Sequence, residues 1–165
     1  MAQPTSSAAW DLGGGGDELP RRAGLRVVLA EDDVEVRLLL AQALRKDGHT
    51  VIEVESGTQL FEFLRALAQG APDESHPDVI VSDIRMPGRS GIDVLASLRE
   101  VGWRTPFVLT TAFGDAATHA RARAAGAFAV FDKPFDVDDL RTVVLNAGRR
   151  AGAACSTSGG LGSTS

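Results

Sequence analysis

The sequence has little cysteine, no excess of positive charge and no long apolar run. Its single cysteine, Cys155, lies among small residues, so an intramolecular disulfide is excluded and a reducing compartment is favoured. The 17 basic residues are outnumbered by 22 acidic ones, which leaves no positive field for a nucleic-acid backbone. No apolar stretch approaches the roughly 18 residues of a membrane span, and the N-terminus lacks the pattern of a signal peptide. We therefore expect a soluble, cytoplasmic protein that binds neither nucleic acid nor membrane.

Both ends of the sequence are poor in large apolar residues. Residues 1–23 are rich in Ser, Ala, Gly and Pro and contain four consecutive glycines, and residues 151–165 have a similar composition. Neither segment can bury enough apolar surface to offset the entropy of ordering it. We predict a disordered N-terminal arm over 1–23, one folded domain over 24–150 and a disordered C-terminal tail over 151–165.

Between these ends, short segments rich in Val and Ile alternate with helical patterns. The expected strands are 25–30, 50–54, 78–82, 106–111 and 127–131. Apolar residues recur at three-to-four spacing after most of these segments, and Ser56 is a candidate cap for the second helix. Strict alternation of strand and helix predicts an α/β fold, in which a five-stranded parallel sheet carries helices on both faces.

The fourth helical segment differs from the others. Between Asp115 and Gly126 it offers alanines but no Leu, Ile, Val or Phe. A helix with so little apolar area to bury should dock weakly, and it should move at low energetic cost.

Candidate site residues follow four of the five predicted strands, whereas the second strand is followed only by Glu55 and Ser56. The candidates are Glu31, Asp32 and Asp33 after the first, Asp83 after the third, Thr110 and Thr111 at the end of the fourth, and Asp132, Lys133 and Pro134 after the fifth. Taken singly, the acidic run could favour a helix N-terminus, Asp83 could cap a turn and Lys133 could be a surface charge. The carboxyl ends of parallel strands lie at one edge of the sheet, however, and that edge is where such folds bind ligands.

These residue types suit phosphoryl transfer. Carboxylates that meet at one edge raise one another's pKa unless they share a cation, and Mg²⁺ suits an open site because it keeps several waters. A metal, the Lys133 ammonium and the Thr111 hydroxyl could stabilise a phosphoryl group that Asp83 attacks to form an acyl phosphate. A cis bond before Pro134 could turn the lysine back over the strand ends.

Residues 25–148 resemble the receiver domain of two-component response regulators. The resemblance is carried by "VVLAEDD", "VSDIRMPGRSG", "VLTTAFGD" and "DKPF", in that order and at family-like spacing. It implies a (βα)5 flavodoxin-like receiver fold in which Asp83 is the phosphoacceptor, Thr111 the switch hydroxyl and Lys133 the lysine of the family. It also implies that a sensor histidine kinase or a histidine phosphotransfer protein donates the phosphoryl group.

The same resemblance implies a metal site and a way to control hydrolysis. Mg²⁺ would be held by Asp32, Asp83 and the backbone carbonyl of Arg85, and Glu31 would reach it through water. Arg85 and Phe113 occupy positions that tune the access of water to the acyl phosphate in the family, and a bulky Phe113 could slow hydrolysis.

One position departs from the family pattern. The residue three before the lysine is usually Tyr or Phe, and it turns inward when the switch hydroxyl moves; here it is Val130. Coupling must then pass through other groups, such as the weakly docked fourth helix. The first helix, with Val36 and Leu40 beside Arg37, resembles the kinase-docking surface of the family, although core packing explains the same residues.

We expect a stand-alone response regulator that signals by contact with an unidentified downstream protein and is not an enzyme for external substrates. The alternative is a phosphorylation-independent, receiver-like binding module, which Val130 alone favours. A haloacid-dehalogenase-like phosphatase also uses an Asp nucleophile, but after its first strand in an Asp-x-Asp pattern, whereas this sequence has Glu31-x-Asp33.

Overall fold

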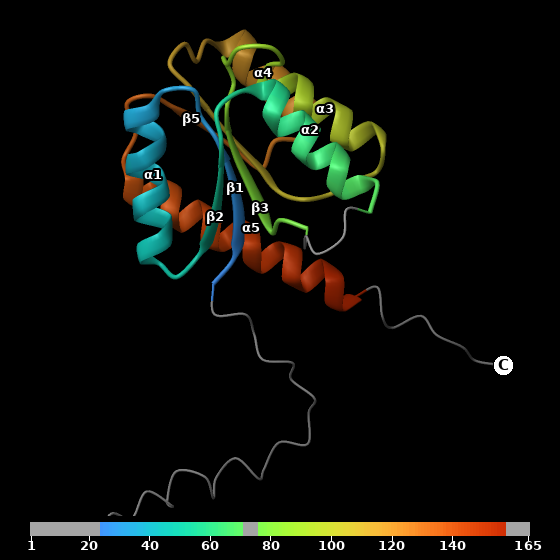
Figure 1. Cartoon of the computed structure of the whole chain (residues 1–165). Helices are drawn as coiled ribbons and strands as arrows, with labels where there is room; N and C mark the ends of the chain where they lie inside the picture. The colour runs from blue at the N-terminus through green and yellow to red at the C-terminus, as the bar shows by residue number, and fades with distance from the viewer. Residues whose placement is uncertain (1–23, 71–75, 158–165) are drawn as a thin grey trace, which may run out of the picture.

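A computed structural model of the chain describes residues 24–70 and 76–157 (Figure 1). One parallel sheet has the strand order β2-β1-β3-β4-β5, which confirms the predicted α/β fold. Its strands are β1 (Arg26–Ala30), β2 (Thr50–Val54), β3 (Val79–Asp83), β4 (Phe107–Thr111) and β5 (Ala129–Asp132). The helices are α1 (Val34–Lys46), α2 (Gly57–Ala68), α3 (Gly91–Glu100), α4 (Ala116–Ala125) and α5 (Val137–Thr157).

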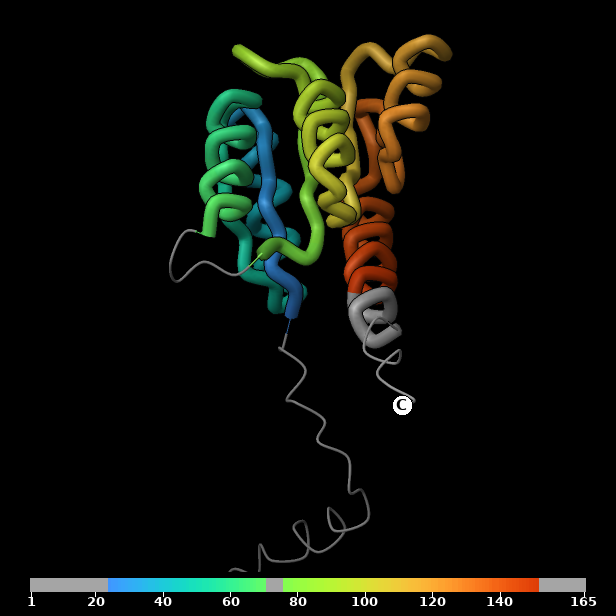
Figure 2. Tube along the Cα trace, turned by 90° about the vertical axis from the view of Figure 1, so that its right-hand side faces the viewer, coloured from blue at the N-terminus to red at the C-terminus, as the bar shows by residue number. Residues whose placement is uncertain are grey.

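The sheet is covered on both faces. Helices α1 and α5 pack on one face, and α2, α3 and α4 lie side by side on the other (Figures 1 and 2). Residues along a strand alternate between the two cores: Val28 and Ile80 face α2 and α3, whereas Val27 and Val79 face α1 and α5. Burial on both sides explains why the strands read as nearly continuous apolar runs.

The helix ends follow from local side-chain chemistry. Asp33, Ser56, Ser90 and Asp115 precede α1 to α4, and each accepts a hydrogen bond from a backbone N–H of the first turn. The predicted cap at Ser56 is therefore confirmed. Helix α4 buries only Ala122, as expected from a sequence without large apolar residues.

The last helix extends further than the sequence predicted. We expected the folded domain to end at residue 150, but α5 continues to Thr157. The alanines at 151, 153 and 154 favour continued helix, since alanine has the highest helix propensity. The predicted arm over 1–23 and the end of the predicted tail, 158–165, lie outside the described residues.

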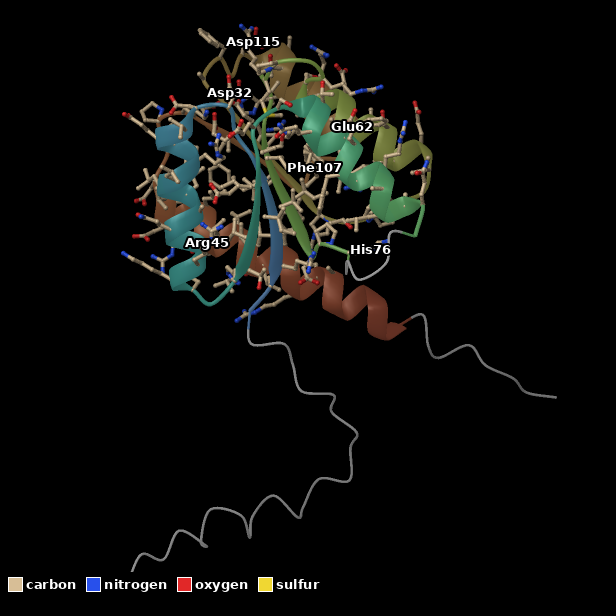
Figure 3. The ribbon with its side chains drawn as sticks, in the orientation of Figure 1. Asp32, Arg45, Glu62, His76, Phe107 and Asp115 are labelled. Atoms are coloured by element: carbon tan, nitrogen blue, oxygen red, sulfur yellow. The ribbon has the colours of Figure 1, made fainter. Side chains whose placement is uncertain are left out.

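The topology creates a crevice at one edge of the sheet. Strand β1 lies beside β3, and the chain leaves β1 towards α1 on one face but leaves β3 towards α3 on the other. Ligands of such folds bind at this reversal of strand order, beyond the carboxyl ends of the strands. Asp32 and Asp115 lie at that edge, whereas Arg45 and His76 lie at the opposite one (Figure 3). Among the described residues, no helix combines the length and apolarity needed to cross a membrane.

Candidate functional site

The centre of the site is an ammonium group held between two carboxylates. The Nζ of Lys133 donates to Glu31 Oε2 at 2.8 Å and to Asp83 Oδ2 at 3.1 Å. Glu31 follows β1 and is 1% exposed, and Asp83 ends β3 and is 7% exposed. Three strands that are distant in sequence therefore bring one cation and two buried anions together.

Backbone geometry at the end of β5 directs the lysine towards the carboxylates. The N–H of Lys133 donates to the carbonyl of Thr111 at 2.7 Å, which prolongs the pairing of β5 with β4. The peptide bond between Lys133 and Pro134 is cis.

The electrostatics of this group reflect burial and mutual attraction. Burial raises the pKa of Glu31 above its ordinary value, and the charge of Asp83 adds to this effect, while the hydrogen bond from Lys133 opposes it. Burial alone would lower the pKa of Lys133, but the hydrogen bonds and charges of Glu31 and Asp83 hold it above its ordinary value. The ammonium is therefore charged throughout the physiological range.

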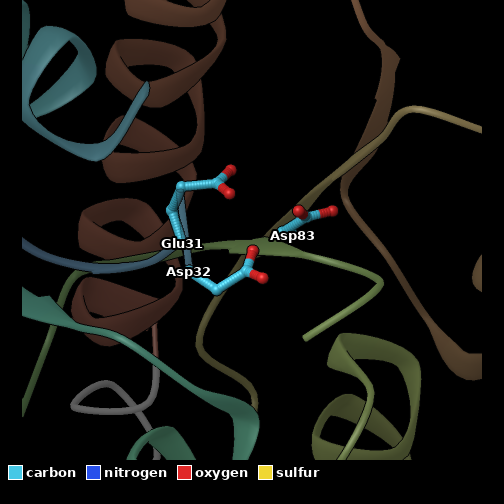
Figure 4. A group of neighbouring side chains, drawn as sticks. All are labelled: Glu31, Asp32 and Asp83. Carbon is cyan, nitrogen blue, oxygen red and sulfur yellow. The ribbon is translucent and has the colours of Figure 1, made fainter. Parts of the chain in front are cut away.

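Three carboxylates are close enough to share a cation. Glu31, Asp32 and Asp83 each place a carboxylate oxygen within 4.8 Å of the others, and Figure 4 shows them gathered beside the ends of β1 and β3. Asp32 is exposed, so the cluster opens to solvent on its side. An all-oxygen donor set with an open side fits Mg²⁺, which binds few carboxylates and retains waters.

The remaining predicted residues lie in the loops around this cluster. Thr111 is buried at the end of β4, and its hydroxyl accepts the N–H of Phe113 at 3.1 Å. The N–H of Arg85 faces Asp83 Oδ1 at 3.4 Å, and its guanidinium lies 4.6 Å from the centroid of the Phe113 ring. This contact joins the loop after β3 to the loop after β4. Val130 is half-buried and packs on the α2–α3 side of the sheet.

Sequence reasoning missed the role of Arg37. The sequence left two interpretations for Val36, Arg37 and Leu40, a docking surface by resemblance or core packing, and the burial of Arg37 and Leu40 agrees with core packing. The Arg37 guanidinium donates to the backbone carbonyl of Glu31 at 2.8 Å and lies 3.3 Å from the carboxylate of Glu55. It thus ties the segment carrying the acidic pair to α1 and β2. An arginine within the apolar pattern of a helix was the available signal.

A second missed contact connects α4 to β5. The Nε2 of His119 lies 2.8 Å from Asp132 Oδ1, beside the backbone of Gly114. A Cβ atom at Gly114 would lie 1.6 Å from that carboxylate oxygen, so a larger residue at this position would require the Asp132 side chain to move. The loop after Thr111, the weakly buried α4 and the residue before Lys133 therefore meet at one point.

Comparisons with known proteins show the family and the fold of this chain. The family model of the response regulator receiver domain matches residues 27–145, and the chain belongs to that family. Among curated relatives, the regulatory protein AtoC of Escherichia coli is 33% identical over 74% of this chain and 25% of its own length. The transcriptional regulatory protein PdtaR of Mycobacterium tuberculosis is 36% identical over 70% of this chain and 52% of its own length.

Other relatives are closer in length to the matched region. Sporulation initiation phosphotransferase F of Bacillus subtilis is 24% identical over 72% of this chain and 90% of its own length. A response regulator receiver domain protein of Clostridium thermocellum superposes with a TM-score of 0.67 at 25% identity, covering 79% of this chain and 98% of its own. The receiver domain of a Francisella response regulator superposes with a TM-score of 0.69 at 23% identity, and the match covers 77% of this chain and 98% of that domain. The chain thus spans a quarter to nine tenths of the length of the curated relatives described here.

Proposed function

We propose that this chain is a response regulator that accepts a phosphoryl group on Asp83 from a histidine kinase or a histidine phosphotransfer protein. The observation that carries the proposal is the Lys133 ammonium, which bridges Asp83 and Glu31 beside a third carboxylate, Asp32. The receiver family match over residues 27–145 supports it independently.

In the proposed reaction, a carboxylate oxygen of Asp83 attacks the phosphorus of a phosphohistidine. The new O–P bond forms as the N–P bond breaks, and the electron pair of that bond returns to the imidazole of the donor. The ammonium of Lys133 stabilises the negative charge that accumulates on the phosphoryl oxygens. Thr111 would donate its hydroxyl hydrogen to one of those oxygens, because in its present contact the hydroxyl oxygen only accepts the N–H of Phe113.

Asp32, Asp83 and the backbone carbonyl of Arg85 would hold Mg²⁺, with Glu31 reaching it through water. When bound, the metal neutralises phosphoryl oxygens in the transition state. The present contact of Lys133 with both Asp83 and Glu31 offsets part of the repulsion among the carboxylates. Arg37 would keep the acidic segment in place by its hydrogen bond to the Glu31 carbonyl.

Loss of the phosphoryl group would be hydrolysis of the acyl phosphate by water. The backbone N–H of Arg85 faces Asp83 and its guanidinium lies over the Phe113 ring, so we expect these two side chains to restrict the approach of that water. Both steps take place on the chain's own side chain, so we propose no turnover of an external substrate.

The proposed output is an interaction with a downstream protein. Helix α4 buries only Ala122, so a rearrangement near Thr111 could shift it at little cost. The second candidate is a phosphorylation-independent binding module, and the single observation in its favour is Val130 in place of an aromatic switch residue.

The test is the intact mass of the full chain after incubation with Mg²⁺ and acetyl phosphate, followed by incubation with a phosphorylated histidine phosphotransfer domain. We expect one phosphoryl group on the wild type and none on Asp83→Asn. Equal modification of both proteins would place the acceptor elsewhere. No modification of the wild type by either donor would favour the binding module.

A further inference from the structure

A second group of charged side chains lies at the amino end of the sheet, opposite the carboxylates. A pocket of about 500 Å³ opens between the last turn of α3, the segment that enters β5 and the C-terminal part of α5. The end of α3 lies next to α5 in Figure 2. Three arginines, Arg99, Arg104 and Arg150, line the pocket, and none of its lining residues is acidic.

The positive charge of this pocket has no anionic partner in the described part of the chain. The ion pairs found there involve none of the three arginines. The sequence contains no Asp or Glu after Asp139, so the remainder of the C-terminal segment supplies no acidic side chain either. In a protein of net charge −5, three guanidinium groups around one pocket that form no ion pair with any described residue are a local excess of positive charge.

Arg99 is held rigidly in the pocket wall. Its guanidinium donates to the backbone carbonyls of Trp103 at 2.6 Å, Thr105 at 3.0 Å and Gly126 at 3.3 Å. These acceptors orient the group but leave its charge uncompensated. Burial lowers the pKa of Arg99 below its ordinary value, and the nearby charge of Arg104 lowers it further, so an anion between the two would relieve their repulsion.

The rest of the pocket is apolar and partly aromatic. Its remaining lining includes Pro106, Ala127, Phe128 and Ala151. The guanidinium of Arg150 lies 5.6 Å from the centroid of the Phe128 ring, so a cation and an aromatic ring stand together on one side. An inorganic anion would use only the arginines, whereas a ligand with a planar group beside its anionic group would also cover the apolar side.

We propose that this pocket binds a nucleoside phosphate, with its phosphates between Arg99 and Arg104 and its base against Phe128 and Arg150. The Arg104 guanidinium can match phosphate oxygens through paired hydrogen bonds, Arg99 adds a positive charge held in place by its backbone contacts, and Arg150 can stack on a planar ring. The proposal uses no residue of the Asp83 site. A competing anionic occupant is the segment of this chain that carries Asp11, Asp17 and Glu18.

The test is calorimetric titration of the full chain with ADP, pyrophosphate and adenosine, in EDTA so that no metal recruits nucleotide to the carboxylates. We expect saturable binding of one ADP, weaker binding of pyrophosphate and no detectable binding of adenosine. Arg104→Gln and Arg150→Gln should each weaken ADP binding about tenfold, since each removes a charged contact with the ligand.

Two control variants distinguish ADP binding in this pocket from nonspecific attraction to positive charge and from binding at Asp83. Arg149→Gln removes an exposed charge next to Arg150 that does not line the pocket, and it should keep the wild-type affinity. Asp83→Asn should also bind ADP normally, so this result stands whether or not Asp83 is phosphorylated.

Three results would overturn the proposal. The first is no ADP binding at millimolar concentration. The second is an equal loss of affinity in Arg149→Gln and Arg150→Gln, which would indicate diffuse attraction. The third is ADP binding that appears only after Asp11, Asp17 and Glu18 are replaced by Asn and Gln, which would assign the pocket to the acidic N-terminal segment.

Discussion

At the carboxyl end of the sheet, Lys133 donates to two carboxylates, whereas at the amino end Arg99 donates to three backbone carbonyls. Both cations are partly buried and both join elements that are distant in sequence. Carboxylate partners can exchange the ammonium for a metal or a phosphoryl group, so the contacts at the carboxyl end can rearrange. Carbonyl partners belong to the backbone, so the contacts at the amino end fix the fold.

At the amino end of the sheet, a buried histidine likewise has a backbone hydrogen-bond partner. His49 is 5% exposed, and its Nδ1 accepts the N–H of Leu25 at 3.0 Å. Burial lowers the pKa of His49 below its ordinary value. For these three groups the difference is the kind of hydrogen-bond partner: Lys133 contacts two carboxylates, whereas Arg99 and His49 contact backbone groups.

The largest effect is expected from Lys133→Ala. The variant removes the cation that stabilises the phosphoryl oxygens, and the initial rate of modification by acetyl phosphate should fall by about a hundredfold. The intact mass, followed over time, measures this rate. Lys46→Ala, at the exposed end of α1, is the control and should react like the wild type. A rate for Lys133→Ala within twofold of the wild type would remove this residue from the proposed reaction.

A smaller effect at the same end is expected from Asp32→Asn. The exposed carboxylate of the cluster is lost, and the affinity for Mg²⁺ should fall by at least about tenfold. Calorimetric titration with MgCl₂ measures the change. Glu35→Gln removes one exposed negative charge nearby without touching the cluster, so it corrects for general electrostatics. Equal affinities in the two variants would contradict a metal site at Asp32.

The sequence predicts which side chains meet at the carboxyl end of the sheet far better than it predicts the contacts at the amino end. Strand alternation brings Glu31, Asp83 and Lys133 to one edge whatever the details of packing, so their proximity could be expected. The contacts of Arg99 could not be predicted from the sequence, because any residue offers a backbone carbonyl and Gly126 lies 27 residues away. The contact of Arg37 with the Glu31 carbonyl was missed for the same reason. Helix α5 continues to Thr157, past residue 150 where we expected the domain to end, because the alanines in that segment favour helix although small residues are also typical of a tail.

At the amino end, Arg99→Leu should destabilise the fold without affecting the chemistry. Three hydrogen bonds from a charged donor are lost and their carbonyls left unpaired, so the free energy of unfolding should fall by about 2–3 kcal/mol. Urea-induced unfolding measures this loss, and Arg123→Leu, an exposed change on α4, should cost far less. The Mg²⁺ affinity of folded Arg99→Leu should equal that of the wild type. A weakened Mg²⁺ site would show that the two ends are coupled.

The smallest effect is expected in the pH dependence of stability at His49. Because its folded pKa lies below the ordinary value of 6.5, the unfolded chain binds the proton more readily, and stability falls as the pH drops below about 6.5. One such group contributes a slope of at most about 1.4 kcal/mol per pH unit, until the pH reaches the folded pKa. His49→Asn keeps an acceptor for the Leu25 N–H but cannot titrate, so urea unfolding between pH 7.5 and 5.5 should show a flatter slope. An unchanged slope in His49→Asn would mean that the buried imidazole of His49 does not cause the loss of stability at low pH.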